Sequence, residues 1–175
     1  DPVWKKAKPG ALQSAQHDDA QWPATIQFAY DAEYLYFAVR CKQPPDAPNA
    51  AAPTERRTRD ADLSAHDRVE VFLDIDRDYF GYYALSVDHR GWTHDSLWGD
   101  GTWNPAWYVA ARQDGGWWTV EVAIPFSELT GRVPKPRDVW AIGVQRVVPG
   151  VGFQSWSTPA AVHVLPDGFG HLVFE

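Results

Sequence analysis

The sequence contains no methionine, a single cysteine, no long apolar run and no excess of positive charge. The lone Cys41 cannot form an internal disulfide, and its place in the apolar stretch 35–41 predicts a small buried hydrophobic residue. The apolar runs are far shorter than the roughly 18 residues that indicate a membrane-spanning helix. We therefore expect a domain that folds without disulfides and does not insert into a bilayer.

The charge balance argues against a nucleic-acid partner. Sixteen basic and 23 acidic residues give a formal net charge of -7, and the basic cluster 56–59 is followed directly by Asp60 and Asp62. Proteins that bind nucleic acids gather Lys and Arg on one face, because contacts to phosphates dominate their affinity. Since no such stripe occurs, we expect neither a nucleic acid nor an anionic membrane as a partner.

Common catalytic motifs are missing as well. The sequence has no Gly-x-Ser-x-Gly elbow and no glycine-rich phosphate loop, and Cys41 has no obvious base. Glu70 and Asp88 fall on adjacent predicted strands and could lie as close as the two carboxylates of a glycoside hydrolase. Such pairs more often bind hydroxyl groups or metal ions, so we predict that the protein is not an enzyme.

Length and composition fit one folded domain. The chain has 175 residues, of which 45% are hydrophobic and 22% are charged, as in ordinary globular domains. A domain of this size buries about 70% of the surface of its unfolded chain. We predict a single domain over residues 1–175. Because the sequence starts at Asp1 and lacks methionine, we expect this domain to be tethered to others in a larger protein.

Short runs with strand-like alternation follow one another along the chain, and no sustained helical spacing occurs. The residues 25–30 and 34–39 form one predicted hairpin, and 69–74 and 82–88 form a second one with an acidic turn. This pattern predicts an all-β fold, an antiparallel two-sheet β-sandwich of jelly-roll type. Further strands are predicted at 108–112, 117–124, 140–147, 153–157 and 170–174, and one helical turn at 125–129 with Pro125 as its first residue.

Ten tryptophans make the chain tryptophan-rich. Most of them suit the core of a sandwich, where Trp107, Trp117 and Trp140 fit strand positions. Trp98 and Trp103 lie in a stretch rich in Gly, Asp and Thr that is typical of loops. An indole exposed there can stack on the apolar face of a pyranose ring while polar neighbours bind its hydroxyl groups. We predict Trp98 and Trp103 as sugar-stacking platforms.

Several stretches of the chain form an ordered set: 29–36, 67–74, 116–126 and 140–146, together with Trp4, Trp156 and 169–170. In this order and spacing they resemble the family 9 carbohydrate-binding modules and the wider DOMON-like β-sandwich superfamily. The resemblance covers nearly the whole chain. It implies a two-sheet sandwich in a secreted or cell-surface protein, which binds the end of a glucan- or xylan-type chain of plant or algal origin and uses calcium as a structural support.

The resemblance also assigns binding residues. Glu70 stands where the family places a carboxylate that accepts hydrogen bonds from sugar hydroxyls. Ser86, Asp88 and Gln145 match polar positions on neighbouring strands, and Arg146 follows directly. These residues are the predicted hydrogen-bonding set for carbohydrate.

The sequence departs from the family at the two tryptophans that clamp the sugar. Their equivalents fall near Ser64 and near Val162 and His163. This departure leaves two functions open, a carbohydrate-binding module that uses Trp98 and Trp103 instead, and an interaction or spacer module without a small ligand. A haem domain is a third alternative, and it would need two histidine ligands because the chain has no methionine.

A metal site is predicted in the acidic turn of the second hairpin. Asp74, Asp76 and Asp78 alternate ahead of Gly81 and can present several oxygens to calcium. Without the family resemblance, a solvated acidic turn explains the same pattern. Zinc is disfavoured, because the spacing of the histidines matches no zinc motif.

Overall fold

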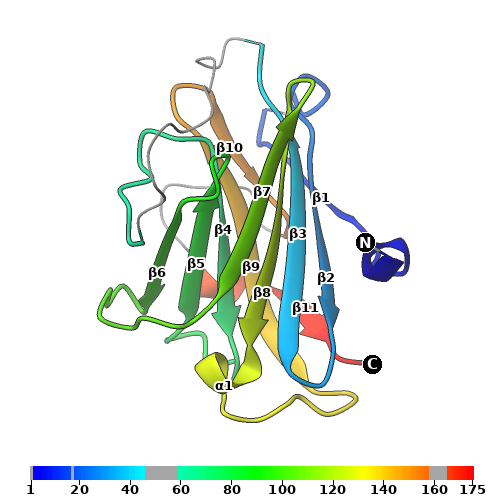
Figure 1. Ribbon diagram of the computed structural model, residues 1–175, viewed down its shortest axis with the longest axis vertical. Coiled ribbons are helices and arrows are strands. Elements are labelled where there is room, and N and C mark those ends of the chain that lie inside the picture. Colours follow the sequence, from blue (N-terminus) through cyan, green and yellow to red (C-terminus); the bar gives the residue numbers. More distant parts are fainter. Residues whose placement is uncertain (1, 17, 46–58, 158–164) are drawn as a thin grey trace.

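The computed structural model describes residues 2–16, 18–45, 59–157 and 165–175. Within these residues the chain forms two antiparallel sheets that pack face to face (Figure 1). The five-stranded sheet has the order β1 (Gly10–Leu12), β2 (Ala24–Tyr30), β3 (Tyr34–Lys42), β8 (Trp117–Pro125), β7 (Tyr108–Asp114). The second sheet has the order β10 (Gly152–Ser155), β9 (Val139–Val148), β4 (Arg68–Asp74), β5 (Tyr83–Asp88), β6 (Thr93–Leu97), and β11 (Gly170–Val173) also pairs with β9.

The predicted all-β sandwich is confirmed, together with both hairpins and the later strands. Helical structure is confined to the turn α1 (Phe126–Leu129) and the short 3-10 helices η1 (Pro2–Lys5) and η2 (Pro166–Gly168) among the described residues, and no helix there is long and apolar enough to cross a membrane. Pro125 precedes α1 as its N-cap instead of opening it. The predictions missed β1, which has three residues, and β6, whose buried positions hold Thr93 and Asp95 instead of apolar side chains.

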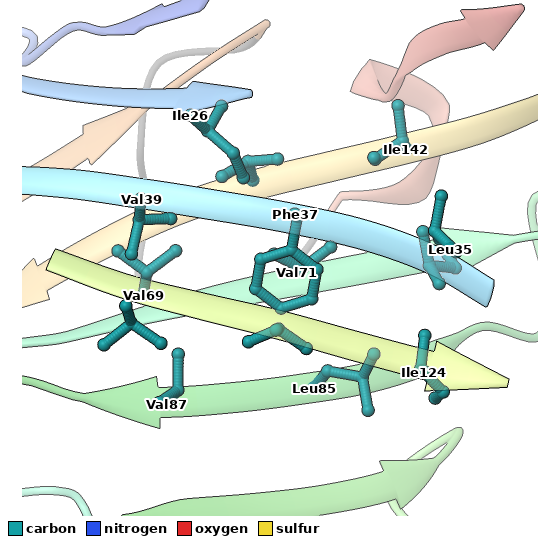
Figure 2. Close-up of a cluster of buried hydrophobic side chains, with 14 of the residues drawn as sticks. Ile26, Leu35, Phe37, Val39, Val69, Val71, Leu85, Val87, Ile124 and Ile142 are labelled. Carbon is teal, nitrogen blue, oxygen red and sulfur yellow. The ribbon is translucent and has the colours of Figure 1, made fainter. Parts of the chain in front are cut away.

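The core lies between the sheets because each strand alternates an inward and an outward side chain. In β4 the inward residues Val69, Val71 and Leu73 are fully buried. Val69 and Val71 face Phe37 and Val39 of β3 (Figure 2). Burying one such side chain stabilises a fold by roughly 1.5–3 kcal/mol. The same alternation turns the even-numbered residues of β4 toward the outer face of the second sheet.

Two adjacent tryptophans of β8 point to opposite faces of the five-stranded sheet. Trp118 is fully buried, as are nearly all atoms of Trp107 and Trp140, in agreement with their predicted core positions. Trp117 was predicted in the core as well, and this prediction is wrong. Because β8 alternates, Trp117 is half-buried on the outer face, where the guanidinium of Arg40 lies 4.0 Å from its ring centroid.

A buried arginine joins the two sheets. Arg146 of β9 points inward and is fully buried, and its Nε and Nη2 donate to the two carboxylate oxygens of Asp67 at 2.9 and 2.7 Å. Its remaining N–H groups reach the carbonyl oxygens of Trp22 and Lys42, which belong to the chain around the five-stranded sheet, and the side chain of Gln154 in β10. All five guanidinium donors are therefore used.

We predict that Arg146→Leu destabilises the fold by about 3–5 kcal/mol, because it leaves the Asp67 carboxylate without its cation and leaves other buried acceptors without a donor. Urea unfolding followed by tryptophan fluorescence measures the change. Arg112→Leu is the matched control: its side chain is 80% exposed, so we expect a change within about 0.5 kcal/mol. Equal losses in the two variants would contradict the role of Arg146.

The two tryptophans of β8 offer a second comparison. Trp118→Ala removes a buried ring and its Nε1 hydrogen bond to Asp67, so we expect a loss of about 3–5 kcal/mol. Trp117→Ala removes an outer-face ring and one cation–π contact, and we expect a loss of about 1 kcal/mol or less. Thermal unfolding of both variants tests this order, and a reversed order would contradict the assignment of faces.

Candidate functional site

A groove of about 370 Å³ lies over the outer face of the second sheet. Strand register builds its centre: Glu70 of β4 pairs with Gln145 of β9 on one side and with Ser86 of β5 on the other, and Ser86 pairs with His94 of β6. Four strands thus contribute one polar row. The lining residues are Ser64, Arg68, Glu70, Phe72, Tyr82, Ala84, Ser86, His94, Ser96, Gln145, Val147, Pro149 and Phe153.

Two hydrogen bonds fix the carboxylate of Glu70. Arg68 Nε donates to Oε1 at 2.6 Å, and Gln145 Nε2 donates to Oε2 at 2.7 Å. Arg68 and Glu70 form a half-buried ion pair with side chains 18% and 15% exposed. Each carboxylate oxygen can accept more than one hydrogen bond, so the oriented group still has capacity for hydroxyl donors from a ligand.

Aromatic rings flank the polar row. Phe153 of β10 pairs with Val147, which lies on the same face as Gln145 two residues earlier. On the other side Tyr82 lines the groove, and burial together with the nearby Glu70 charge raises the pKa of its phenol. Polar groups between aromatic rings match the apolar face and hydroxyl rim of a sugar.

One glycine makes room for a ring that packs against the groove residue Phe72. Gly143 of β9 pairs with Phe72 of β4, and the ring of Phe169 lies where a Cβ at position 143 would be. Phe169 stacks with Phe72, with ring centroids 6.0 Å apart, and both contact Tyr82 edge-on. Phe169, just before β11, therefore packs against Phe72 and Tyr82, two rings that line the groove.

The structure brings together Glu70, Ser86 and Gln145 from the predicted binding set, but places Asp88 and Arg146 elsewhere. Asp88 ends β5 and is fully buried, and its oxygens accept hydrogen bonds from the backbone N–H of Arg90 and Trp92 and from Arg90 Nε. It holds the turn before β6. Arg146 lies on the inner side of the sheet, because neighbouring strand residues face opposite ways, so the prediction that it contacts sugar is wrong.

The two predicted platforms lie outside the groove lining. Trp98 is 58% exposed at the end of β6, packs against Phe80 with centroids 4.6 Å apart, and donates its backbone N–H to Tyr82 O at 2.8 Å. It therefore stands beside the groove. Trp103 is half-buried against Tyr83 on the core side, which makes it part of the packing instead of a free platform.

The positions that correspond to the family's two clamp tryptophans carry no tryptophan in this chain. Ser64 lines the groove and presents no ring. Val162 and His163 lie outside the described residues.

The sequence analysis missed several lining residues, among them Arg68, Tyr82, His94 and Phe153. Strand alternation could have found two of them. Arg68 lies two residues from Glu70, and Tyr82 lies four residues from Ser86, so the residues of each pair point to the same face. Because only tryptophans were considered as stacking rings, Tyr82 and Phe153 were overlooked. His94 could not be found without the unpredicted strand β6.

The predicted metal ligands converge at the turn between β4 and β5. One oxygen from each of Asp74, Asp76 and Asp78 lies within 4.8 Å of the others. Asp74 is fully buried, its two oxygens accept the backbone N–H groups of Arg77 and Tyr79, and burial raises its pKa. Three carboxylates at a tight turn are oxygen donors of the kind that calcium binds, so the donor set fits this ion.

Comparisons with known proteins agree with the fold. A structure of a family 9 carbohydrate-binding module from Caldicellulosiruptor kristjanssonii in complex with cellotriose is similar over 99% of this chain and 85% of that chain, with 18% identity and a TM-score of 0.71. The same module in complex with glucose is similar over 100% and 87%, with 18% identity and a TM-score of 0.73. Comparison with curated protein sequences finds no significant match. The family model described as carbohydrate family 9 binding domain-like matches residues 1–150.

Proposed function

The chain belongs to the carbohydrate family 9 binding domain-like family, and from this we propose that it binds a polysaccharide chain in the groove over the second sheet without catalysing a reaction on it. One observation supports this most strongly: the row Gln145, Glu70, Ser86 and His94 lies at the centre of the groove, with Phe153 and Tyr82 among the lining residues. A sugar needs polar partners, since its hydroxyls must be hydrogen-bonded once they lose water. It also needs an aromatic ring to cover its apolar face.

Each group then has a stated role. Glu70 accepts hydrogen bonds from two sugar hydroxyls, and Arg68 and Gln145 hold it in place. Ser86 and Gln145 add donors and acceptors beside it, while Phe153 or Tyr82 contacts an apolar ring face. The exposed ring of Trp98 next to Tyr82 extends the site for a longer chain.

The ligand class follows from the balance of charge in the groove. Arg68 and Glu70 neutralise each other as an ion pair, so the site favours a neutral glycan over a uronic acid or a sulfated sugar. We propose a glucan- or xylan-type chain, as in plant or algal polysaccharides. The relative from C. kristjanssonii has been seen in complex with cellotriose and with glucose, which supports this class.

The absence of catalysis is proposed on the groove's chemistry. Glycoside hydrolysis uses two carboxylates on either side of the scissile bond. Among the described groove residues Glu70 is the single carboxylate, and it is held by Arg68 and Gln145. Because polysaccharides of this kind occur outside cells, we propose that the domain is a secreted module that delivers a larger protein to its substrate.

Glu70→Ala tests the groove. It removes the central acceptor, and we expect affinity for cellohexaose or xylohexaose to fall by roughly tenfold or more, since a hydrogen bond to a charged group contributes about 1.5–3 kcal/mol. Isothermal titration calorimetry measures the affinity. Glu33→Ala in the exposed β2–β3 turn is the control and should bind like the wild type. If Glu70→Ala bound as tightly as the control, the sugar site would not be this groove.

We also propose that Asp74, Asp76 and Asp78 bind a structural calcium ion. A cation would offset the desolvation of the buried Asp74 carboxylate, so millimolar calcium should raise the Tm of the wild type by several degrees. Asp76→Asn should remove most of this rise, while Asp100→Asn in another exposed turn should not. Differential scanning calorimetry with calcium and with a chelator measures both, and an unchanged wild-type Tm would contradict the site.

A further inference from the structure

The outer face of the five-stranded sheet has a groove of its own, on the opposite side of the sandwich from the Glu70 groove. It has a volume of about 440 Å³ and runs over β3, β8 and β7. Trp117, the tryptophan that faces away from the core, lines it together with Arg40 and Thr119. In Figure 1 these three strands lie side by side along the long axis. An indole on an open sheet face requires an explanation, because it contributes little to the core.

Strand register arranges this face in polar rows. Trp117 lies between Lys42 and Asp114, and Thr119 in the next row lies between Arg40 and Arg112. In the row after that, Glu121 lies between two alanines, whose small side chains leave the space above it open. Alternation puts all of these side chains on one face.

Several of these polar groups have free hydrogen-bonding capacity. The guanidinium of Arg40 stacks over the Trp117 ring, which fixes its position without using its N–H donors. Within the part of the chain that the structure describes, the side chains of Arg40, Thr119 and Glu121 form no hydrogen bond or ion pair with another residue. Arg112 and Asp114 form an exposed ion pair at 3.3 Å, and such pairs open at little cost.

Aromatic rings return at the far end of the same face. Tyr36 and Tyr108 flank Ala123, and Tyr34 contacts both rings with centroids 5.9 and 6.3 Å away. Tyr108 is 60% exposed. Trp117 and Ala123 are separated by six residues of β8, which span about 20 Å at a strand rise of about 3.4 Å per residue.

The chemistry of this face selects its ligand. The groove residues include two guanidinium groups and two carboxylates, so their charges balance, and Lys42 beside Trp117 adds one positive charge at the end of the face. A balanced face attracts neither a polyanion nor a cationic partner. Rings at two ends with hydrogen-bonding groups between them suit a neutral, extended molecule with apolar faces and many hydroxyls.

We propose that the outer face of the five-stranded sheet is a second glycan-binding surface, which takes a neutral, extended oligosaccharide along β8 with Trp117 as the stacking platform at one end and Tyr108 at the other. The surface does not depend on the Glu70 groove, and the two lie back to back. A polysaccharide chain bound on each side would let one domain bridge two chains.

The test combines calorimetry with NMR of the tryptophan indole N–H signals, using cellohexaose and xylohexaose as probes. The Trp117 signal is assigned from its disappearance in Trp117→Phe. We expect this signal to shift on titration in the Glu70→Ala protein, with a residual affinity that Trp117→Ala weakens by roughly tenfold or more. Val173→Ala, which trims a 54% exposed side chain on β11 of the other sheet, is the control and should leave that residual affinity unchanged.

A second variant distinguishes a loss of binding from a loss of folding. Tyr108→Ala alters an exposed ring at the other end of the face and should also weaken the residual binding, with an unchanged Tm. If the Trp117 signal stays still and neither variant changes binding to the Glu70→Ala protein, the second surface is refuted.

The outcomes separate the two sites. Loss of all binding in Glu70→Ala supports the first groove and refutes the second surface. Binding that depends on Trp117 and not on Glu70 supports the second surface and refutes the first groove. A concentration-dependent dimer in sedimentation that Trp117→Ala dissociates, with no effect of the sugars on the Trp117 signal, would assign this face to a second copy of the chain and overturn the proposal.

Discussion

The buried Arg146 is the constraint on which the arrangement of the sheets depends. A guanidinium without partners is too costly to keep out of water, so each of its five donors must meet an acceptor at a fixed distance. These acceptors come from Asp67 just before β4, from carbonyl groups around the five-stranded sheet and from β10. Trp118 adds its indole N–H to Asp67 from β8. The spacing of the sandwich at this end is thus set by directional bonds as well as by packing.

This network also positions the groove. Asp67 is followed directly by Arg68, and Arg146 directly follows Gln145, so the two residues that hold Glu70 are each covalent neighbours of the buried ion pair. Neighbouring strand residues point to opposite faces. One face of this part of the sheet is therefore fixed by the ion pair, and the other face presents the polar row to solvent.

Much of the fold and part of the site could be predicted from the sequence. The family resemblance assigned Glu70 and Ser86 to the binding set, and strand register places them side by side on one face. Alternation applied to Gln145 and Arg146 shows that these two neighbours cannot both face the groove. Alternation could not say which of Trp117 and Trp118 faces the core, since two adjacent rings fit the pattern equally well. It also could not show that Asp88, at a strand end, is used by its own turn.

The pairing of Gly143 with the ring of Phe169 has a consequence for how this scaffold can be re-engineered. Gly143 has no side chain, and the ring of Phe169 occupies the place that a Cβ there would take, next to the groove residue Phe72. Adding even a methyl group there would displace Phe169 and, through their stacking, Phe72. The packing around Phe72 on this outer face can thus be varied at position 143 while Glu70, Ser86 and Gln145 stay unchanged.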